Sequence, residues 1–233
     1  IHTRNLILKA RQLGMSTLAI LYLLDECLFN ENISAGIVSY SVEHAKYIFR
    51  KVIGHALDNI AQKYKPLVGI VQSSAREITF SNGSSLRVDT TLRGGAYQMV
   101  LVSEFGKTCA RSPIKAEEVI TGTLNTLSQS GTVIIESTGE GNEGYFADMC
   151  HSASLRGNDN LTSLDYKLFF FPWYMEPSYV LDQRVTYEID VEDYFTKIQQ
   201  QQCVILTQFQ KNWYAQQWQL LGDNVKQEFP STV

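Results

Sequence analysis

The stretch KARQLGMST, residues 9–17, decides the fold of this chain, because it joins an apolar strand to an apolar helix. The strand is expected at residues 5–9. The helix is expected at residues 16–29, a run rich in leucine, isoleucine and alanine that is too apolar for a surface helix. A strand, a short loop and a buried helix in this order are typical of an α/β domain whose helix packs beneath the sheet.

Apolar segments with strand character recur along the chain, and helical patterns or turns separate them. Ser41 is the expected N-cap of a long helix, and Pro113 is expected to open another one. Strands are expected at 36–40, 68–71, 77–80, 85–88, 99–102, 132–136 and 167–171, and helices at 42–63, 113–124 and 144–155. This pattern predicts an α/β fold: three α/β/α layers around a mostly parallel central sheet.

The composition changes after Pro172, where glutamine becomes frequent and helical patterns dominate. We expect an α/β core at residues 1–172, a small helical lid or linker region at 173–226 and the start of a linker at 227–233. The chain begins at Ile1 and stops without a terminating pattern, so we expect a piece of a longer protein.

Composition and charge exclude several classes of protein. The chain has 233 residues with 20 Lys and Arg against 24 Asp and Glu, a formal charge of −4, which excludes a generally basic coat for nucleic acid but allows a local basic patch. No apolar run approaches the roughly 18 residues that a membrane span needs. The four cysteines are far apart in the sequence and form no metal-binding pattern, so we expect reduced thiols.

Residues 9–17 also resemble a phosphate-binding loop, whose common form is GxxxxGK[ST]. Gly14 and Ser16 take the places of the second glycine and the hydroxyl, Lys9 stands at the place of the first glycine, and Met15 replaces the usual lysine. The cation for a bound phosphate must therefore come from Lys9 or Arg11. Considered alone, the loop is equally compatible with an ordinary strand–turn–helix.

Two further segments end apolar strands with polar side chains. Residues 99–107 (MVLVSEFGK) place Glu104 just after a strand, and residues 134–146 (IIESTGEGNEGYF) place Ser137 and Thr138 before a glycine-rich turn. Ligands of open α/β sheets bind at the carboxyl ends of parallel strands. The loops after all three strands are therefore expected to meet at one site.

The three segments, in this order and spacing, resemble the large terminase subunits, the DNA-packaging motors of tailed bacteriophages. Residues 9–17 resemble their variant phosphate loop, in which some members carry the lysine early. Residues 99–107 resemble a Walker B strand in which Ser-Glu replaces Asp-Glu, and residues 134–146 resemble the coupling motif. Residues 169–173 and 227–232 resemble further parts of the same family, and the latter precede its nuclease domain.

The resemblance implies an ATPase that uses ATP and Mg2+. It implies that Glu104 activates water, that Lys9 or Arg11 neutralises the γ-phosphate, and that Arg11 is also a candidate cis arginine finger. Ser16 is the implied magnesium ligand, with Ser103 as a weaker, water-mediated contact. The implied nucleotide-binding residues are Gln12, Leu13, Gly14, Met15, Ser16 and Thr17, and the implied coupling residues are Ser137 and Thr138.

The same resemblance implies partners and a location. The partners are double-stranded DNA, the portal protein of the procapsid, the small terminase subunit and further copies in a homo-oligomeric ring, with no membrane. The location is the host bacterial cytoplasm, with transient docking on the procapsid. Arg93, Lys107 and Arg111 are the weaker candidates for DNA contact.

The family pattern is incomplete in this sequence. Little room precedes Lys9 for the adenine-recognising segment, and the nuclease domain does not follow the linker, so we expect a truncated ATPase domain whose parent is also an endonuclease. Two alternatives stay open. One is a helicase-like P-loop ATPase. The other is a catalytically inactive prophage remnant that binds DNA or portal, which Met15, Ser103 and the short segment before Lys9 keep open.

Overall fold

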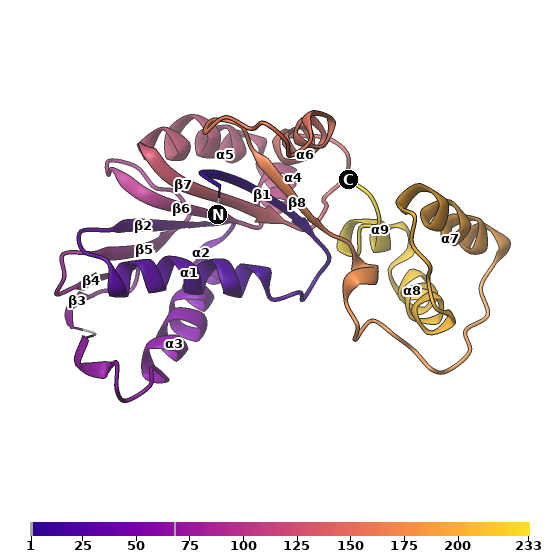
Figure 1. Cartoon of the computed structure of the whole chain (residues 1–233), viewed down its shortest axis with the longest axis horizontal. Coiled ribbons are helices and arrows are strands. Elements are labelled where there is room, and N and C mark those ends of the chain that lie inside the picture. Colours follow the sequence, from indigo (N-terminus) through magenta and orange to yellow (C-terminus); the bar gives the residue numbers. More distant parts are fainter. Residues whose placement is uncertain (1, 68) are drawn as a thin grey trace.

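The computed structural model describes residues 2–67 and 69–233 as a helix-covered sheet with a helical lobe beside it (Figure 1). The eight strands have the order β3-β4-β5-β2-β6-β7-β1-β8, and all neighbours pair in parallel except β3 with β4 and β4 with β5. The strands are β1 (Arg4–Lys9), β2 (Ser34–Ser39), β3 (Ile70–Ser73), β4 (Glu77–Phe80), β5 (Ser85–Asp89), β6 (Tyr97–Ser103), β7 (Leu127–Ser137) and β8 (Lys167–Phe171). The predicted α/β fold with a mostly parallel sheet is confirmed.

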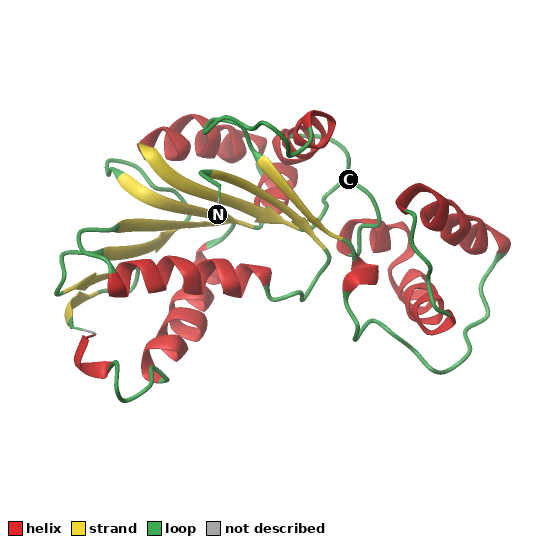
Figure 2. Cartoon of the chain, viewed as in Figure 1, coloured by secondary structure: helices red, strands yellow, loops and turns green. Residues whose placement is uncertain are grey.

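Helices lie on both faces of the sheet and make up most of the lobe (Figure 2). None of the helices in the described ranges is both long enough and apolar enough to cross a bilayer. The α-helices are α1 (Met15–Phe29), α2 (Val42–Tyr47), α3 (Gly54–Asp58), α4 (Phe105–Arg111), α5 (Pro113–Glu118), α6 (Tyr145–Arg156), α7 (Ile189–Gln202), α8 (Gln208–Leu221) and α9 (Val225–Glu228).

Successive residues of a strand pack alternately into two separate apolar layers, one on each face of the sheet. In β1, Ile7 packs against one layer, whereas Leu6 and Leu8 pack against the other. In β6, Leu101 and Val102 divide in the same way. Side chains alternate between the faces of a strand, so strands buried on both faces read as continuous apolar runs. The first layer contains α1, and the second contains α4 and α6.

The long helix expected at 42–63 begins as predicted and ends early. The Ser41 side chain accepts a hydrogen bond from the backbone N–H of His44 at 3.1 Å, which confirms the N-cap. α2 continues through a π-helical segment, Ile48–Ile53, into α3, which ends at Asp58 rather than Lys63. The wider π turn lets the chain stay helical while the direction of its apolar face changes.

Two other segments differ from the sequence-based expectation. The sequence analysis did not predict α4, which begins directly after Glu104. The helix expected at 113–124 is α5 followed by a π-helical turn, Val119–Thr123, and a 3-10 turn, Leu124–Thr126. Of the strand expected at 68–71, residue 68 lies outside the described residues, and the observed strand β3 begins at Ile70.

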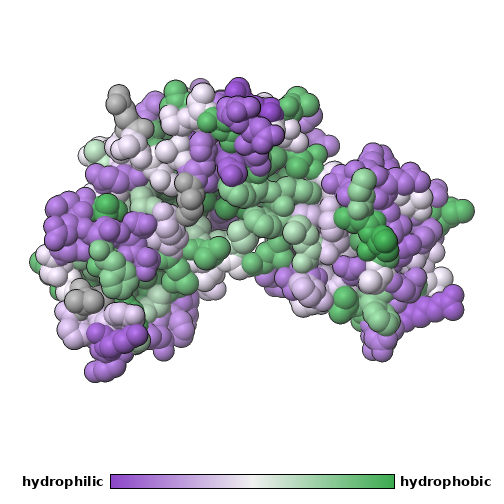
Figure 3. Space-filling model, in the orientation of Figure 1, coloured by the Kyte–Doolittle hydropathy of each residue, from purple (hydrophilic) through white to green (hydrophobic). Residues whose placement is uncertain are grey.

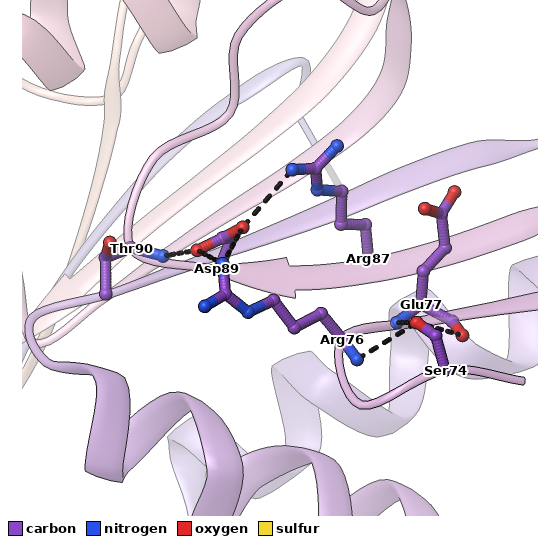
Figure 4. A network of polar contacts seen from close by, with 6 residues as sticks. All are labelled: Ser74, Arg76, Glu77, Arg87, Asp89 and Thr90. Atoms are coloured by element: carbon purple, nitrogen blue, oxygen red, sulfur yellow. Dashed lines mark hydrogen bonds and ion pairs between the residues drawn. The ribbon is translucent and has the colours of Figure 1, made fainter.

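A carboxylate ties the antiparallel edge of the sheet together (Figure 4). Asp89 Oδ2 lies 3.1 Å from Arg76 Nη1 and 3.2 Å from Arg87 Nη2, and Asp89 Oδ1 accepts from the Thr90 N–H at 2.8 Å. Burial alone would raise the pKa of Asp89, but the Thr90 N–H and the two guanidinium groups outweigh it and hold the pKa below its usual range. The network joins the turn before β4 to the end of β5.

The helical lobe has its own aromatic core. Trp173 and Tyr214 are fully buried in it with ring centroids 4.5 Å apart, and Trp213 and Trp218 pack against the same cluster. Ser231 Oγ accepts from Trp173 Nε1 and from the hydroxyl of Tyr194, both at 2.8 Å. Hydrophilic residues cover much of the lobe's outer surface on the face shown in Figure 3.

Candidate nucleotide site

Three adjacent strands bring the key polar side chains to one edge of the sheet. β7 lies between β1 and β6, and its residue Glu136 stands opposite both Ile7 of β1 and Ser103 of β6. Side chains two residues apart on a strand share a face, so Lys9 points to the same face as Ile7. Lys9, Glu136 and Ser103 therefore converge although they lie far apart in the sequence.

Contacts between these side chains form a buried charge network. Lys9 Nζ lies 3.2 Å from Glu136 Oε2 and 3.4 Å from Glu104 Oε1. Ser103 Oγ donates a hydrogen bond to Glu136 Oε1 at 2.6 Å, and Lys107 Nζ lies 2.8 Å from Glu104 Oε2. Lys9 is 4% exposed and Glu136 is fully buried. Two cations thus balance two anions, which is the condition for keeping charges inside a protein.

The network shifts the titration of its members in opposite directions. Burial alone would lower the pKa of Lys9, but the charges of Glu136 and Glu104 outweigh it and hold the pKa above its usual range. Burial alone would raise the pKa of Glu104, but Lys9 and Lys107 outweigh it and hold this pKa below its usual range. Lys9 and Glu104 therefore both carry their charges at neutral pH.

The loop after β1 has the backbone of a tight turn into α1. Gln12 and Gly14 have φ values of 56° and 72°, in the left-handed region. Gly14 is the N-cap, no side chain caps the first turn and no acidic residue lies in it. Met15 packs against the hydrophobic core. Ser16 lies half-buried in the first turn, where unpaired N–H groups and the helix dipole favour an anion.

Arg11 and Lys9 point to different neighbours. Arg11 Nε lies 3.2 Å from Glu228 Oε2 of α9, and the Arg11 N–H donates to the Glu228 carbonyl at 3.0 Å. The hydroxyl of Tyr179 donates to the Arg11 carbonyl. Of the two cations that the sequence offers for a terminal phosphate, Lys9 is the one that contacts Glu104, whereas Arg11 is bound to the helical lobe.

The remaining nucleotide-binding candidates occupy the same loop and helix start. Gln12 and Gly14 are exposed in the loop, with Leu13 half-buried between them. Leu13 packs against the aromatic core of the helical lobe. Thr17 is exposed in the first turn of α1. The loop therefore contacts the lobe on one side and the sheet edge on the other.

Glu104 and the coupling candidates lie beside each other. Glu104 adopts a left-handed backbone, with φ 55° and ψ 47°, directly before α4, a conformation that costs energy in any residue but glycine. A Cβ atom placed on Gly106 would lie 2.8 Å from Ser137 Oγ and 3.0 Å from the Thr138 carbonyl. Ser137 Oγ and Thr138 Oγ1 are buried and have no hydrogen-bond partner among the described residues.

The sequence analysis missed two residues of this neighbourhood, Glu136 and His44. Glu136 was expected only as the last residue of a buried strand, and the signal that could have found it is a carboxylate that needs a partner in such a strand. Ser39 Oγ lies 2.7 Å from His44 Nδ1. Burial lowers the pKa of His44, while the charges of Glu104 and Glu136 oppose that shift.

The three candidates for DNA contact have different partners. Arg93 pairs with Glu118 of α5. Lys107 and Arg111, both on α4, lie 5.8 and 5.4 Å from the centre of the Tyr40 ring. Lys107 also belongs to the charge network, so Arg93 and Arg111 are the two candidates on the open surface.

The oxygen donors fit a magnesium ion that arrives with phosphates. Magnesium in nucleotide sites keeps several waters and takes only one or two protein oxygens in addition to phosphate oxygens. The half-buried hydroxyl of Ser16 is one such donor. Ser103 Oγ gives its proton to Glu136 and keeps lone pairs for a metal-bound water.

The fold is shared with phage packaging proteins of known structure. The chain superposes on the large terminase ATPase domain of Thermus phage P74-26 with a TM-score of 0.65 and 16% identity, covering 99% of this chain and 88% of that one. The large terminase of bacteriophage HK97 gives a TM-score of 0.60 and 14% identity over 98% of this chain and 46% of that one. No protein-family model and no curated protein matches the sequence. The chain therefore has the fold of the ATPase domain of bacteriophage large terminases.

Proposed function

We propose that this chain is the ATP-hydrolysing motor domain of a phage or prophage large terminase, which couples ATP hydrolysis to the movement of double-stranded DNA into a procapsid. The observation that carries the proposal is the Lys9–Glu104 pair at the carboxyl edge of the sheet, next to the start of α1. A cation for the terminal phosphate and a carboxylate for water stand together there, beside N–H groups suited to phosphates.

The chemistry follows from these positions. The N–H groups of residues 12–16 bind the phosphates, and Lys9 neutralises the γ-phosphate. Glu104 orients the attacking water and accepts its proton, because Lys9 and Lys107 keep it ionised. Magnesium, held by Ser16 and through water by Ser103, would neutralise charge on the phosphate oxygens.

The nucleotide site contacts α9, where the lobe passes into the linker, at two places. Arg11 pairs with Glu228 of α9, and a Cβ atom on Gly139 would lie 3.2 Å from the Gln227 carbonyl. Ser137 and Thr138 directly precede Gly139. We assign them to coupling, since their hydroxyls are buried next to the turn that contacts α9 and have no hydrogen-bond partner in the part of the chain that the structure describes. The lobe at residues 173–226 is the lid of this proposal, and 227–233 the start of its linker.

Steady-state ATP turnover and nucleotide binding of the purified chain test the proposal. Glu104→Gln should lower ATP turnover about a hundredfold or more, because the amide cannot accept the proton of the attacking water, and it should leave nucleotide binding intact. Glu31→Gln, which changes an exposed glutamate in the turn after α1, is the matched control and should behave as wild type. Wild-type turnover by Glu104→Gln would refute the assignment, and binding without hydrolysis by the wild type would favour a non-hydrolysing remnant.

DNA is the proposed track of the motor, and portal protein, small terminase subunit and further copies of the chain are its proposed partners in the bacterial cytoplasm. Backbone phosphate contacts suit a motor that ignores sequence, and they make affinity fall with salt. Arg93→Ala and Arg111→Ala should each weaken DNA binding and flatten its salt dependence. Salt-independent affinity would argue against a basic contact surface.

A further inference from the structure

Lys9 has two carboxylate partners that differ in how firmly they are held. Glu136 is fully buried, lies 3.2 Å from Lys9 Nζ and is fixed by the Ser103 hydroxyl at 2.6 Å. Glu104 lies farther from Lys9 Nζ, at 3.4 Å, keeps 13% of its side chain exposed and has Lys107 as an alternative partner at 2.8 Å. One partner is thus built into the sheet and the other is exchangeable.

We propose that Glu136 is a positioning residue that anchors Lys9, so that an arriving γ-phosphate replaces Glu104 at the Lys9 ammonium while Glu136 stays bound. The sheet supplies the geometry, because β7 lies between the strand of Lys9 and the strand of Ser103. After the exchange Glu104 no longer contacts Lys9. It stays paired with Lys107 and can orient the attacking water. Binding of the triphosphate therefore also prepares the carboxylate that acts on the water.

The inference rests on the proposed function and predicts a property of binding itself. An anchored Lys9 adds affinity for the γ-phosphate, which a triphosphate has and a diphosphate lacks. Glu136 therefore controls the preference for ATP over ADP. If Glu136 only stabilised the fold, its loss would weaken the binding of both nucleotides equally.

The test measures the dissociation constants of fluorescent N-methylanthraniloyl ATP and ADP with the purified chain. Glu136→Gln keeps the shape and removes the charge, and it should reduce the preference for the triphosphate about tenfold, as expected for loss of a group that orients a binding residue. Lys9→Met should abolish the preference. Glu31→Gln, which changes an exposed glutamate outside the three site segments in the same way, should leave it unchanged.

A double-mutant cycle shows whether Glu136 acts through Lys9. The double variant Lys9→Met/Glu136→Gln should match Lys9→Met alone, because the anchor has nothing left to hold. A further loss of preference in the double variant would show that Glu136 acts elsewhere, and would overturn the inference. Circular dichroism confirms that each variant is folded.

Glu136→Asp keeps the charge but retracts it by one methylene, so its preference for ATP should fall between those of wild type and Glu136→Gln. If Glu136→Gln does not fold, a folded Glu136→Asp with wild-type preference overturns the inference. If the wild type binds neither nucleotide, the proposed function fails and this role fails with it. If the wild type binds and hydrolyses ATP while Glu136→Gln keeps the full preference, only the role of Glu136 is wrong.

Discussion

Ser137 Oγ lies against Gly106, so close that a Cβ atom on residue 106 would stand 2.8 Å from it. The end of β7 and the start of α4 can therefore touch only because residue 106 has no side chain. Glu104 lies two residues before this contact, so the spacing between the two elements also sets the position of the carboxylate.

Gly106→Ala should lower ATP turnover by about tenfold or more, because it pushes α4 away from β7 and displaces Glu104. In an open helix the same change would add about 1 kcal/mol of stability, but here we expect the melting temperature to fall. Steady-state turnover and thermal melting measure both effects. Gly122→Ala is the control, since a Cβ atom there meets nothing within 4 Å. Wild-type turnover by Gly106→Ala would contradict the importance of this contact.

Lys9→Met should destabilise the fold by about 3 kcal/mol, because it leaves the buried carboxylates of Glu136 and Glu104 without their shared cation. Urea unfolding monitored by tryptophan fluorescence measures the change in the free energy of unfolding. Lys51→Met, at an exposed helical position, should change that free energy by no more than about 0.5 kcal/mol. Equal stability of the two variants would mean that the network contributes nothing to the fold.

Cys203→Gly should stabilise the chain by about 1 kcal/mol. Cys203 is exposed and ends α7 in the left-handed conformation, with φ 52° and ψ 41°, which glycine adopts without steric cost. Gly157→Ala, at a helix end with φ 75° and ψ −177°, a conformation that essentially only glycine adopts, should instead destabilise the chain by more than that amount. Thermal melting should show a higher melting temperature than wild type for Cys203→Gly and a lower one for Gly157→Ala. A lower melting temperature of Cys203→Gly would contradict the argument.

Asp89→Asn should destabilise the chain by about 1 kcal/mol at neutral pH, since the amide loses its charge-assisted bonds to Arg76 and Arg87. The folded-state pKa of Asp89 lies below its ordinary value of 3.8, so the carboxylate adds stability above that value. This stability is lost as the pH falls through the lower, folded-state pKa. Urea titrations between pH 7 and pH 2 should show the loss in wild type and a smaller one in Asp89→Asn.

Local patterns predicted the strands well. β4 and β8 begin and end where the sequence analysis placed them, because a turn or a proline bounds each apolar run. The unexpected helix α4 has only seven residues, and it begins at a left-handed Glu104 that no cap motif announces. A short helix of this kind is fixed by its packing on β7, and that contact is not visible in local sequence.

The candidate site was predictable only where local sequence patterns mark its residues. Lys9 and Glu104 each end an apolar strand, so their type and place indicate chemistry. Glu136 was missed because its partners come from strand register, which pairs it with Ser103 and places Lys9 on the same face. Arg11 is one of the two cations that the sequence offers for a phosphate, and its contact with Glu228 could not be predicted because the two residues lie almost a whole chain apart.

The register of β7 also has a consequence for how the sheet assembles. A slip of one residue would turn Glu136 into the layer that holds Val133 and Ile135, and would leave Lys9 buried without its anchor. Apolar residues such as valine and isoleucine tolerate such a slip, but a buried ion pair does not. The charges that prepare the site for nucleotide thus also select the correct strand register, because a sheet assembled in a shifted register would have a higher free energy.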